Sequence, residues 1–478
     1  MYKDNKISYD RNEIKNLEFC KRYLKPKAQI NSALEKDYFQ NDNNNYSLTE
    51  KGQNFAENFL LNQQQNGKNN DTEAKTQNKN RESENMNSSL SLNQILYGPP
   101  GTGKTYSTII KAMEIMGSEK VQMFDGNNFK TDYNEEEYKI LKEEFDKYKK
   151  LGQIEFVTFH QSYSYEEFVE GIKPYIPEWG STENAEVKYV GKDGIFKRMC
   201  SFKNLWEEFK KNHPVPFEMK TISNGSSFNI TEYRKDSFKV DKIGNLIPVS
   251  ELEKIYELDL KHHFKIQHEI RDFISDSRYS SYCFSILQEL NKPQILIIDE
   301  INRGDVSKIF GELITLIEED KRIGNKYQMK VTLPYSKESF GVPNNLYIIG
   351  TMNTTDRSIA LLDTALRRRF DFEEIMPKPE LLSNEVIEDT KIKPQTLLEK
   401  INEHIAKKYD KDHQIGHSYL MDVKTKEQLQ RAYKNRILPL LNEYFYNDSK
   451  TVAEILNCSE DELKTADFIS ILEKAQGE

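Results

Sequence analysis

One eight-residue stretch limits the folds open to this chain more than any other feature. The stretch fits the phosphate-loop pattern G-x-x-x-x-G-K-[ST] and consists of Gly98, Pro99, Pro100, Gly101, Thr102, Gly103, Lys104 and Thr105. A short apolar run, Ile95-Leu96-Tyr97, precedes it, and a helical pattern from Tyr106 to Met116 follows it. A strand, a glycine-rich loop and a helix in this order are typical of α/β nucleotide-binding domains. We therefore predict an α/β fold that binds a nucleoside triphosphate.

Each part of this loop has a chemical role toward phosphate. The glycines let backbone N–H groups close around the phosphates, and the helix N-terminus adds a partial positive charge. Lys104 can reach the β- and γ-phosphates, and the Thr105 hydroxyl can bind Mg²⁺. Tyr106 completes the predicted nucleotide-binding set. The alternative, an ordinary glycine turn, is disfavoured by the Lys-Thr pair and by the flanking strand and helix.

Two acids follow a second apolar run. Ile295 to Ile298 predicts a buried strand, and Asp299 and Glu300 stand at its carboxyl end. In a parallel sheet this position lies beside the phosphate loop. We expect Asp299 to hold Mg²⁺ through its water shell and Glu300 to orient or deprotonate the attacking water. The alternative is an exposed acidic strand end without a catalytic role.

A third apolar run, Leu346 to Gly350, predicts another buried strand that leads to Asn353. The amide of Asn353 can bind the γ-phosphate and the water.

Three consecutive arginines, Arg367 to Arg369, then precede Phe370. In ring ATPases an arginine of one subunit enters the site of its neighbour, and we predict Arg369 for this role, with Arg368 second. Alternatively the cluster pairs with nearby acids, a role that suits Arg367 best; the acids are Asp371, Glu373 and Glu374.

The amino-terminal part divides by composition into a small module and a linker. Residues 1–61 contain helical segments, and a strand, turn and amphipathic helix between Tyr46 and Leu60 resemble the end of a winged-helix domain. The first 30 residues hold eight Lys or Arg and four acids, which suits contact with a phosphate backbone or a protein-interaction module with a basic face. Residues 62–89 are polar and are expected to form a disordered linker.

The remainder is expected to form two further parts. Residues 90–378 alternate strands with helices, as in an α/β domain, and short strands broken by Asn-Gly and Gly-Asn turns predict a β-rich insertion at about 212–257. Residues 379–478 contain helical segments and predict a separate helical lid. His413 and His417 are four residues apart, but Gly416 would break the helix needed to align them on a metal, so we favour structural roles for both.

Composition excludes several classes of protein. The 478 residues carry a net charge of −9, so a globally basic nucleic-acid coat is excluded, although a local basic patch is not. The four cysteines are far apart and form no Cys-x-x-Cys pair, which argues against a zinc knuckle or a disulfide framework. The N-terminus lacks a signal-peptide core, and no apolar run is long enough to span a bilayer. We expect a soluble, cytoplasmic protein without membrane association.

Several motifs in fixed order resemble a known family. The phosphate loop is followed by Ile-Asp-Glu-Ile-Asn-Arg-Gly from Ile298, Met-Asn-Thr-Thr-Asp-Arg-Ser from Met352 and Leu-Arg-Arg-Arg-Phe from Leu366. This order resembles AAA+ proteins, and specifically the McrB-type GTPase subunit of modification-dependent restriction systems. Four further segments strengthen the resemblance, which covers about residues 93–441; they are Phe156–Gly171, Ile309–Glu318, Asp320–Arg322 and Ile415–Leu420.

The resemblance implies a specific activity. It implies an AAA+ core with a helical lid, a hexameric ring, Mg²⁺-dependent hydrolysis of GTP or ATP, and action on DNA with a McrC-like nuclease subunit. Asn353 and Asp356 match the family motif and are implied to be catalytic. Residues 1–61 do not match the domain that reads modified cytosine in the family. The alternative is a MoxR-like ATPase that remodels protein complexes without cutting DNA.

Overall fold

The computed structural model describes residues 90–121, 133–175, 188–221, 225–256, 279–355, 364–465 and 467–477, and the backbone of residues 39–42 and 45–48. The chain forms two compact units, Met1–Ser88 and Ser89–Glu478. In the first unit, β1 (Phe39–Asp42) and β2 (Asn45–Leu48) form an antiparallel hairpin. The rest of the predicted winged-helix module and linker lies outside the described residues. Among the residues described, no helix has the length and apolarity needed to cross a membrane.

A five-stranded parallel sheet forms the centre of the second unit. The strands lie in the order β15-β3-β14-β11-β4. Their bounds are Asn93–Gly98 for β3, Ile154–Thr158 for β4, Gln294–Asp299 for β11, Leu346–Asn353 for β14 and Asp371–Glu374 for β15. The first strand in sequence therefore lies between the last two. The chain runs from β3 to β4 on one side of β3 and later crosses from β14 to β15 on its other side. Open α/β sheets bind ligands at the carboxyl ends of the strands, where the strand order reverses.

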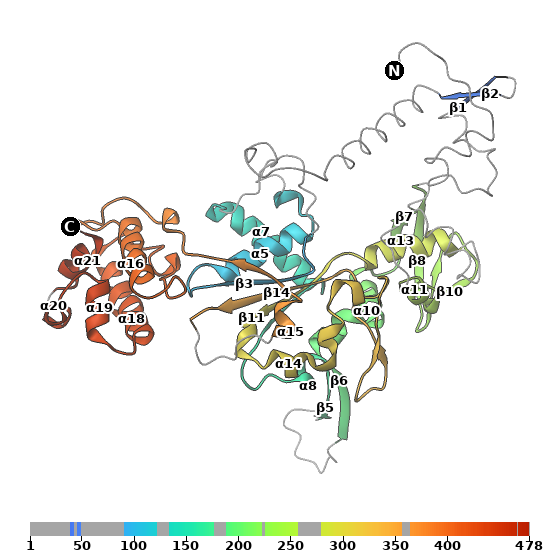
Figure 1. The fold of residues 1–478 in the computed structure, drawn as a ribbon. Helices are drawn as coiled ribbons and strands as arrows, with labels where there is room; N and C mark the ends of the chain where they lie inside the picture. The colour runs from blue at the N-terminus through green and yellow to red at the C-terminus, as the bar shows by residue number, and fades with distance from the viewer. Residues whose placement is uncertain are drawn as a thin grey trace. The chain divides into compact units, whose positions relative to one another are not determined.

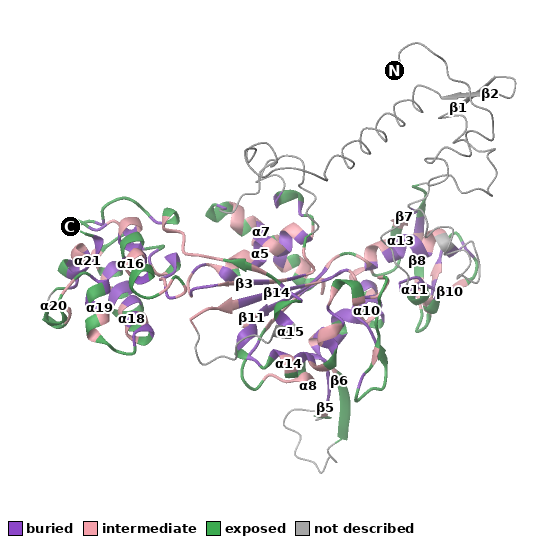
Figure 2. Ribbon diagram, in the orientation of Figure 1, coloured by how far each residue is buried: buried purple, intermediate pink, exposed green. Residues whose placement is uncertain are grey.

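Helices cover both faces of this sheet (Figure 1). On one face lie α5 (Lys104–Ile115) and α7 (Glu135–Lys150), and on the other lie α8 (Tyr165–Phe168) and α14 (Val306–Phe310). Within β11, Ile295 and Ile297 pack toward the first pair of helices, and Leu296 and Ile298 toward the second. Successive side chains of a strand point to opposite faces. A strand covered on both sides must therefore be continuously apolar, and these four residues are fully buried (Figure 2).

An exposed hairpin projects from the second face of the sheet domain. It consists of β5 (Glu170–Tyr175) and β6 (Lys188–Asp193), and a buried lysine of α9 (Ile195–Cys200) ties its base to the domain. Lys197 Nζ lies 2.8 Å from Glu170, 2.9 Å from Asp193 and 2.8 Å from Glu338. Burial alone would raise the pKa of Glu170. The hydrogen bonds from Lys197 and from backbone N–H groups outweigh it and lower that pKa to about 2.

The predicted β-rich insertion is confirmed. Four antiparallel strands lie in the order β10-β9-β8-β7; their bounds are Phe217–Lys220 for β7, Ser227–Tyr233 for β8, Ser237–Val240 for β9 and Leu246–Pro248 for β10. They share a separate hydrophobic core with α10 (Phe202–Asn212), α11 (Val249–Tyr256) and α13 (Ser280–Leu290). The core thus extends to helices on both sides of the predicted insertion. The structure describes α11 as far as Tyr256, and residues 257–278 lie outside the described ranges.

The carboxyl-terminal part forms the predicted helical lid around its own core. Its helices are α16 (Pro394–Lys408), α17 (Lys426–Ala432), α18 (Leu438–Tyr444), α19 (Ser449–Ile455), α20 (Glu460–Thr465) and α21 (Phe468–Gln476). A π-helical turn at Tyr433–Ile437 interrupts the helical run from α17 to α18. Pro439 explains the interruption, because it has no N–H to donate and its ring crowds the carbonyl four residues earlier.

Candidate nucleotide-binding site

The phosphate loop joins β3 to α5 at the carboxyl edge of the sheet. Gly101 has φ 76° and Gly103 has φ 80°, a left-handed conformation that glycine adopts without steric cost. Gly103 immediately precedes α5 and has no side chain to cap it, so the first N–H groups of the helix are available to an anion. The side chain of Lys104 is buried and its Nζ donates to the carbonyls of Gly98 at 2.9 Å and Pro99 at 2.7 Å.

Tyr106, the last residue of the predicted nucleotide-binding set, packs against α7. The Tyr106 ring stacks on Tyr138 of α7 at a centroid distance of 4.1 Å, and its hydroxyl lies 3.4 Å from the Tyr133 carbonyl. Tyr106 therefore helps to join α5 to α7. Its predicted role toward a nucleotide stays a prediction.

The two acids at the end of β11 lie beside this loop. Asp299 Oδ1 is 3.5 Å from the Thr105 hydroxyl and accepts a hydrogen bond from Thr351 at 2.6 Å. The Thr351 hydroxyl also accepts from the Glu300 backbone N–H at 3.1 Å. Glu300 itself has φ 52°, a conformation that costs a non-glycine residue about 1–3 kcal/mol. Thr351 thus fixes both acids, one through its carboxylate and one through its backbone.

Two more side chains hold the Glu300 carboxylate. Asn353 Nδ2 donates to Glu300 Oε1 at 2.6 Å, and Arg303 Nε lies 3.3 Å from Glu300 Oε2. Neither Arg303 nor Thr351 was singled out from the sequence. Thr351 could have been found by alternation, because residues 351 and 353 of one strand point to the same face. Arg303 lies in a 3₁₀ turn, Ile301–Arg303, for which hydrophobic periodicity gives no signal.

The oxygen atoms at this edge fit a magnesium ion. Thr105 and Asp299 offer a hydroxyl and a carboxylate close together, and hard oxygen ligands are what Mg²⁺ prefers. Mg²⁺ usually takes only one or two protein ligands and completes its shell with water and phosphate oxygens. This explains why the described residues contain no cluster of three or more acidic, histidine or cysteine ligands. Thr105 and Asp299 are therefore the residues that would hold the ion.

The lid touches the phosphate loop directly. Ser418 N donates to the Gly101 carbonyl at 3.1 Å, and Lys378 N donates to His417 Nδ1 at 3.2 Å. A Cβ atom at Gly416 would lie 2.1 Å from the carbonyl carbon of Gly101, so only glycine allows this approach. His417 is buried in this contact, whereas His413 bonds to Asp410 at 2.6 Å. The two histidines therefore serve different contacts.

The arginines lie at the opposite end of the sheet. Arg367 ends α15 (Thr364–Arg367), and Arg368 and Arg369 lie between α15 and β15. The Arg369 carbonyl accepts a hydrogen bond from Asn93, the first residue of β3. Gly98 ends β3 five residues later, roughly 17 Å away at about 3.3 Å per residue. This distance exceeds the reach of an arginine side chain. Neither Arg368 nor Arg369 can therefore serve the phosphate loop of its own chain.

Individual arginines have different surroundings. The Arg369 side chain is 3% exposed and bonds to Glu318 at 2.7 Å, whereas Arg368 is 68% exposed and lies 3.5 Å from the same carboxylate. Arg367 lies 5.9 Å from the ring centre of Phe372. Of the three acids expected to pair with this cluster, Glu373 bonds to Lys111 and Glu374 bonds to Lys411. Asp356, the remaining predicted catalytic residue, lies outside the described residues.

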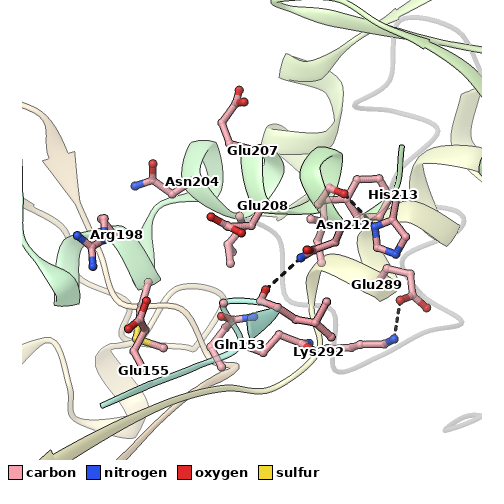
Figure 3. A pocket seen from close by; sticks show the side chains of 17 residues that line it. Gln153, Glu155, Arg198, Asn204, Glu207, Glu208, Asn212, His213, Glu289 and Lys292 are labelled. Atoms are coloured by element: carbon pink, nitrogen blue, oxygen red, sulfur yellow. Dashed lines mark hydrogen bonds and ion pairs between the residues drawn. The ribbon is translucent and has the colours of Figure 1, made fainter. Parts of the chain in front are cut away.

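A pocket of about 260 Å³ lies away from this site (Figure 3). It is formed by α10 together with the amino ends of β4 and β11, and its lining includes Gln153, Glu155, Arg198, Glu208 and Gln294. Ligands of open α/β sheets bind at the carboxyl ends of the strands. This pocket lies at the amino ends of the strands, whereas the phosphate loop lies at their carboxyl ends. We therefore assign the nucleotide to the loop.

Comparison with known families agrees with this architecture. Residues 256–370 match the AAA domain of the dynein-related subfamily, and residues 393–453 match the alpha-helical lid domain of McrB. The first match contains both acids, Asn353 and the arginines. The second contains Gly416, His417 and Ser418, which touch the phosphate loop.

Two curated relatives are similar over part of their length. The Type IV methyl-directed restriction enzyme EcoKMcrB subunit of Escherichia coli (strain K12) is 41% identical over 194 residues, which are 36% of this chain and 41% of that protein. The Type II restriction enzyme BsuMI component YdiS of Bacillus subtilis (strain 168) is 26% identical over 203 residues, 38% of this chain and 55% of that protein. The chain thus matches about half or less of each relative.

The fold class predicted from the sequence is confirmed, with a parallel sheet flanked by helices and followed by a helical lid. The phosphate loop, the paired acids and the lid contact lie where such a domain requires them. The matches to an AAA domain and to the McrB lid, on this fold, show that the chain is similar to McrB-type AAA+ proteins.

Proposed function

We propose that this chain is the nucleoside-triphosphate-hydrolysing subunit of a modification-dependent DNA restriction system. One observation carries the proposal. The phosphate loop, both acids and Asn353 meet at one edge of the sheet, while two arginines lie at the opposite edge, out of reach of that loop. The domain thus offers the two halves of a hydrolytic site, and each half needs a second subunit to complete it.

Within one subunit, each residue of the first half has a defined task. The loop N–H groups and Lys104 bind the phosphates. Thr105 and Asp299 would hold Mg²⁺, which would neutralise charge on the phosphate oxygens. Glu300 orients the attacking water and accepts its proton. Asn353 fixes the Glu300 carboxylate through the 2.6 Å hydrogen bond and presents its amide to the γ-phosphate.

The second half comes from a neighbouring subunit in a ring, for which we propose six subunits. The more exposed Arg368 enters the adjacent site, and Arg369 anchors the segment through Glu318. This reverses the order predicted from the sequence, because burial of Arg369 removes it from the subunit surface. An arginine supplied in trans stabilises charge on the transferred phosphoryl group and raises the rate by about 10³–10⁵ in known cases.

We propose GTP as the substrate, with ATP as the alternative, and a McrC-like nuclease subunit as the partner that cuts DNA. The support is the match to the McrB lid and the names of both relatives, which are restriction enzymes. Asp356 is proposed as a further catalytic residue on its position in the Asn-Thr-Thr-Asp motif.

Mixing inactive subunits tests the shared site. Lys104→Ala removes the phosphate-binding half, and Arg368→Ala removes the arginine half. Each variant alone is expected to be inactive with either purine nucleotide, and a mixture of the two restores part of the turnover because some interfaces then contain two intact halves. Failure to recover at every mixing ratio would contradict the shared site. Lys104→Ala mixed with Glu300→Gln is the control, since both changes damage the same half.

A further inference from the structure

We infer that Asn93 and Arg322 are positioning residues for the arginine half of the hydrolytic site. They hold the segment that carries Arg368 and Arg369 against the amino end of the sheet, so that Arg368 projects toward the neighbouring subunit. The inference rests on the proposed function and extends it to two residues that contact neither nucleotide nor phosphate.

Arg322 is a fully buried cation that donates its hydrogen bonds to neutral oxygen atoms. Its exposure is 0%, and its guanidinium donates to the carbonyls of Ile317 at 3.1 Å, Pro343 at 3.2 Å and Leu346, and to Asn93 Oδ1 at 2.7 Å. Burial lowers the pKa of Arg322 to about 10, so the group remains charged at neutral pH. Buried charges are normally paired with opposite charges. Here the fixed fork of the guanidinium instead joins three segments of the chain, at Ile317, at Pro343 to Leu346 and at Asn93.

Arg322 also determines which way the Asn93 amide faces. A guanidinium only donates, so the amide oxygen must turn toward it and the NH₂ group must turn away. Asn93 Nδ2 donates to the carbonyls of Ile317 at 2.9 Å and Arg369 at 3.0 Å. Asn93 is itself 5% exposed. A continuous chain of hydrogen bonds thus runs from the buried Arg322 through Asn93 to the backbone of Arg369.

The result is a rigid support next to the exposed Arg368. The backbone of Arg369 is held by Asn93 and its side chain by Glu318, while the adjacent Arg368 is 68% exposed. Beside it lies an open hollow of about 490 Å³ bounded by Asn93, Glu318, Asp371 and both arginines. Because Arg369 is held at its backbone and at its side chain, the neighbouring Arg368 has less conformational freedom. Arg368 therefore loses less conformational entropy when it enters the adjacent site.

A purely structural role is the competing explanation, because Asn93 begins the strand that leads to the phosphate loop. Asn93→Asp separates the two explanations. It keeps an oxygen for Arg322 but removes both donated hydrogen bonds, including the one to Arg369. Asn345→Asp is the matched control, since Asn345 is also buried, donates to the Lys292 carbonyl at 2.9 Å and accepts from Tyr256 at 3.4 Å.

We expect Asn93→Asp to reduce turnover at least tenfold while nucleotide binding and the thermal midpoint remain similar to those of Asn345→Asp. The decisive measurement mixes Asn93→Asp with Lys104→Ala subunits of the full chain. Asn93→Asp subunits keep an intact phosphate loop, and Lys104→Ala subunits keep intact arginines. The mixture should therefore regain turnover, as is expected for Arg368→Ala mixed with Lys104→Ala.

Other results overturn the inference in distinguishable ways. If Arg368→Ala is rescued by Lys104→Ala but Asn93→Asp is not, Asn93 acts on its own phosphate loop, and the proposed function stands while the inference fails. If Lys104→Ala rescues neither Arg368→Ala nor Asn93→Asp, the shared site of the proposed function is refuted, and the inference that rests on it is refuted with it. Full activity of Asn93→Asp also overturns the inference. If Asn93→Asp does not fold, Asn93→Ser takes its place, and failure of both to fold would show that the residue serves the whole fold.

Discussion

Replacement of Thr351 by valine tests the geometry of the acidic pair. The two side chains have nearly the same shape, so the change removes mainly the hydroxyl. That hydroxyl donates to Asp299 at 2.6 Å and accepts from the Glu300 N–H at 3.1 Å. A hydrogen bond to a charged group contributes about 1.5–3 kcal/mol. If this contribution is lost from the stabilisation of the transition state, kcat decreases by about 10- to 150-fold.

The assay is steady-state nucleotide turnover as a function of Mg²⁺ concentration, with nucleotide affinity measured separately. We expect Thr351→Val to lower kcat and to raise the Mg²⁺ requirement, because Asp299 loses a partner that fixes it beside Thr105. Nucleotide affinity should change less, since the phosphate loop is untouched.

Thr221→Val is the matched control for this variant. Thr221 is also buried, and its hydroxyl both donates to the Ser226 carbonyl at 3.2 Å and accepts from the Ser226 N–H at 3.1 Å, but it lies in the β-rich insertion. A similar loss of stability without loss of kcat is expected there. Equal kcat in Thr351→Val and wild type would refute the argument that Thr351 fixes the two acids.

Three further variants test other parts of the account. Lys104→Ala should abolish nucleotide binding in a fluorescence titration, because the phosphates lose their charged partner, and wild-type affinity would refute the assignment. Glu300→Gln should bind nucleotide but lower kcat by about 10²–10⁴ in the turnover assay, and normal turnover would remove Glu300 from the mechanism. The pKa of Glu170 is lowered from 4.5 to about 2, so its stabilisation is complete above pH 4.5 and is lost as the pH falls toward 2. Glu170→Gln should therefore lower the free energy of unfolding by up to about 3 kcal/mol at pH 7 and by little at pH 2, and a pH-independent difference in urea unfolding would contradict this.

Much of the core could be predicted from the sequence because its elements have strong local patterns. The run from Ile295 to Ile298 must be a buried strand in almost any fold, and the phosphate-loop pattern requires a strand before it and a helix after it. The short strands of the insertion were predicted from Asn-Gly and Gly-Asn turns, which favour hairpins.

The parts that were missed depend on contacts between distant segments. Thr351 bonds to residues 52 and 51 positions away, and Arg322 bonds to Asn93 across 229 positions. No periodicity reports such contacts. The sequence cannot distinguish Arg368 from Arg369 for the same reason. The two residues are adjacent, and only the position of Glu318 makes one a buried ion pair and the other an exposed cation.

The central claim is that nucleotide is cleaved in a pocket that two subunits share. The most direct test is the turnover of GTP and ATP per chain, measured over a wide range of protein concentrations with Mg²⁺ and with the nuclease partner present. The account predicts that turnover per chain falls as dilution separates the subunits, in step with the loss of the assembled ring. Turnover per chain that is independent of dilution, or no consumption of either nucleotide at any concentration, would contradict it.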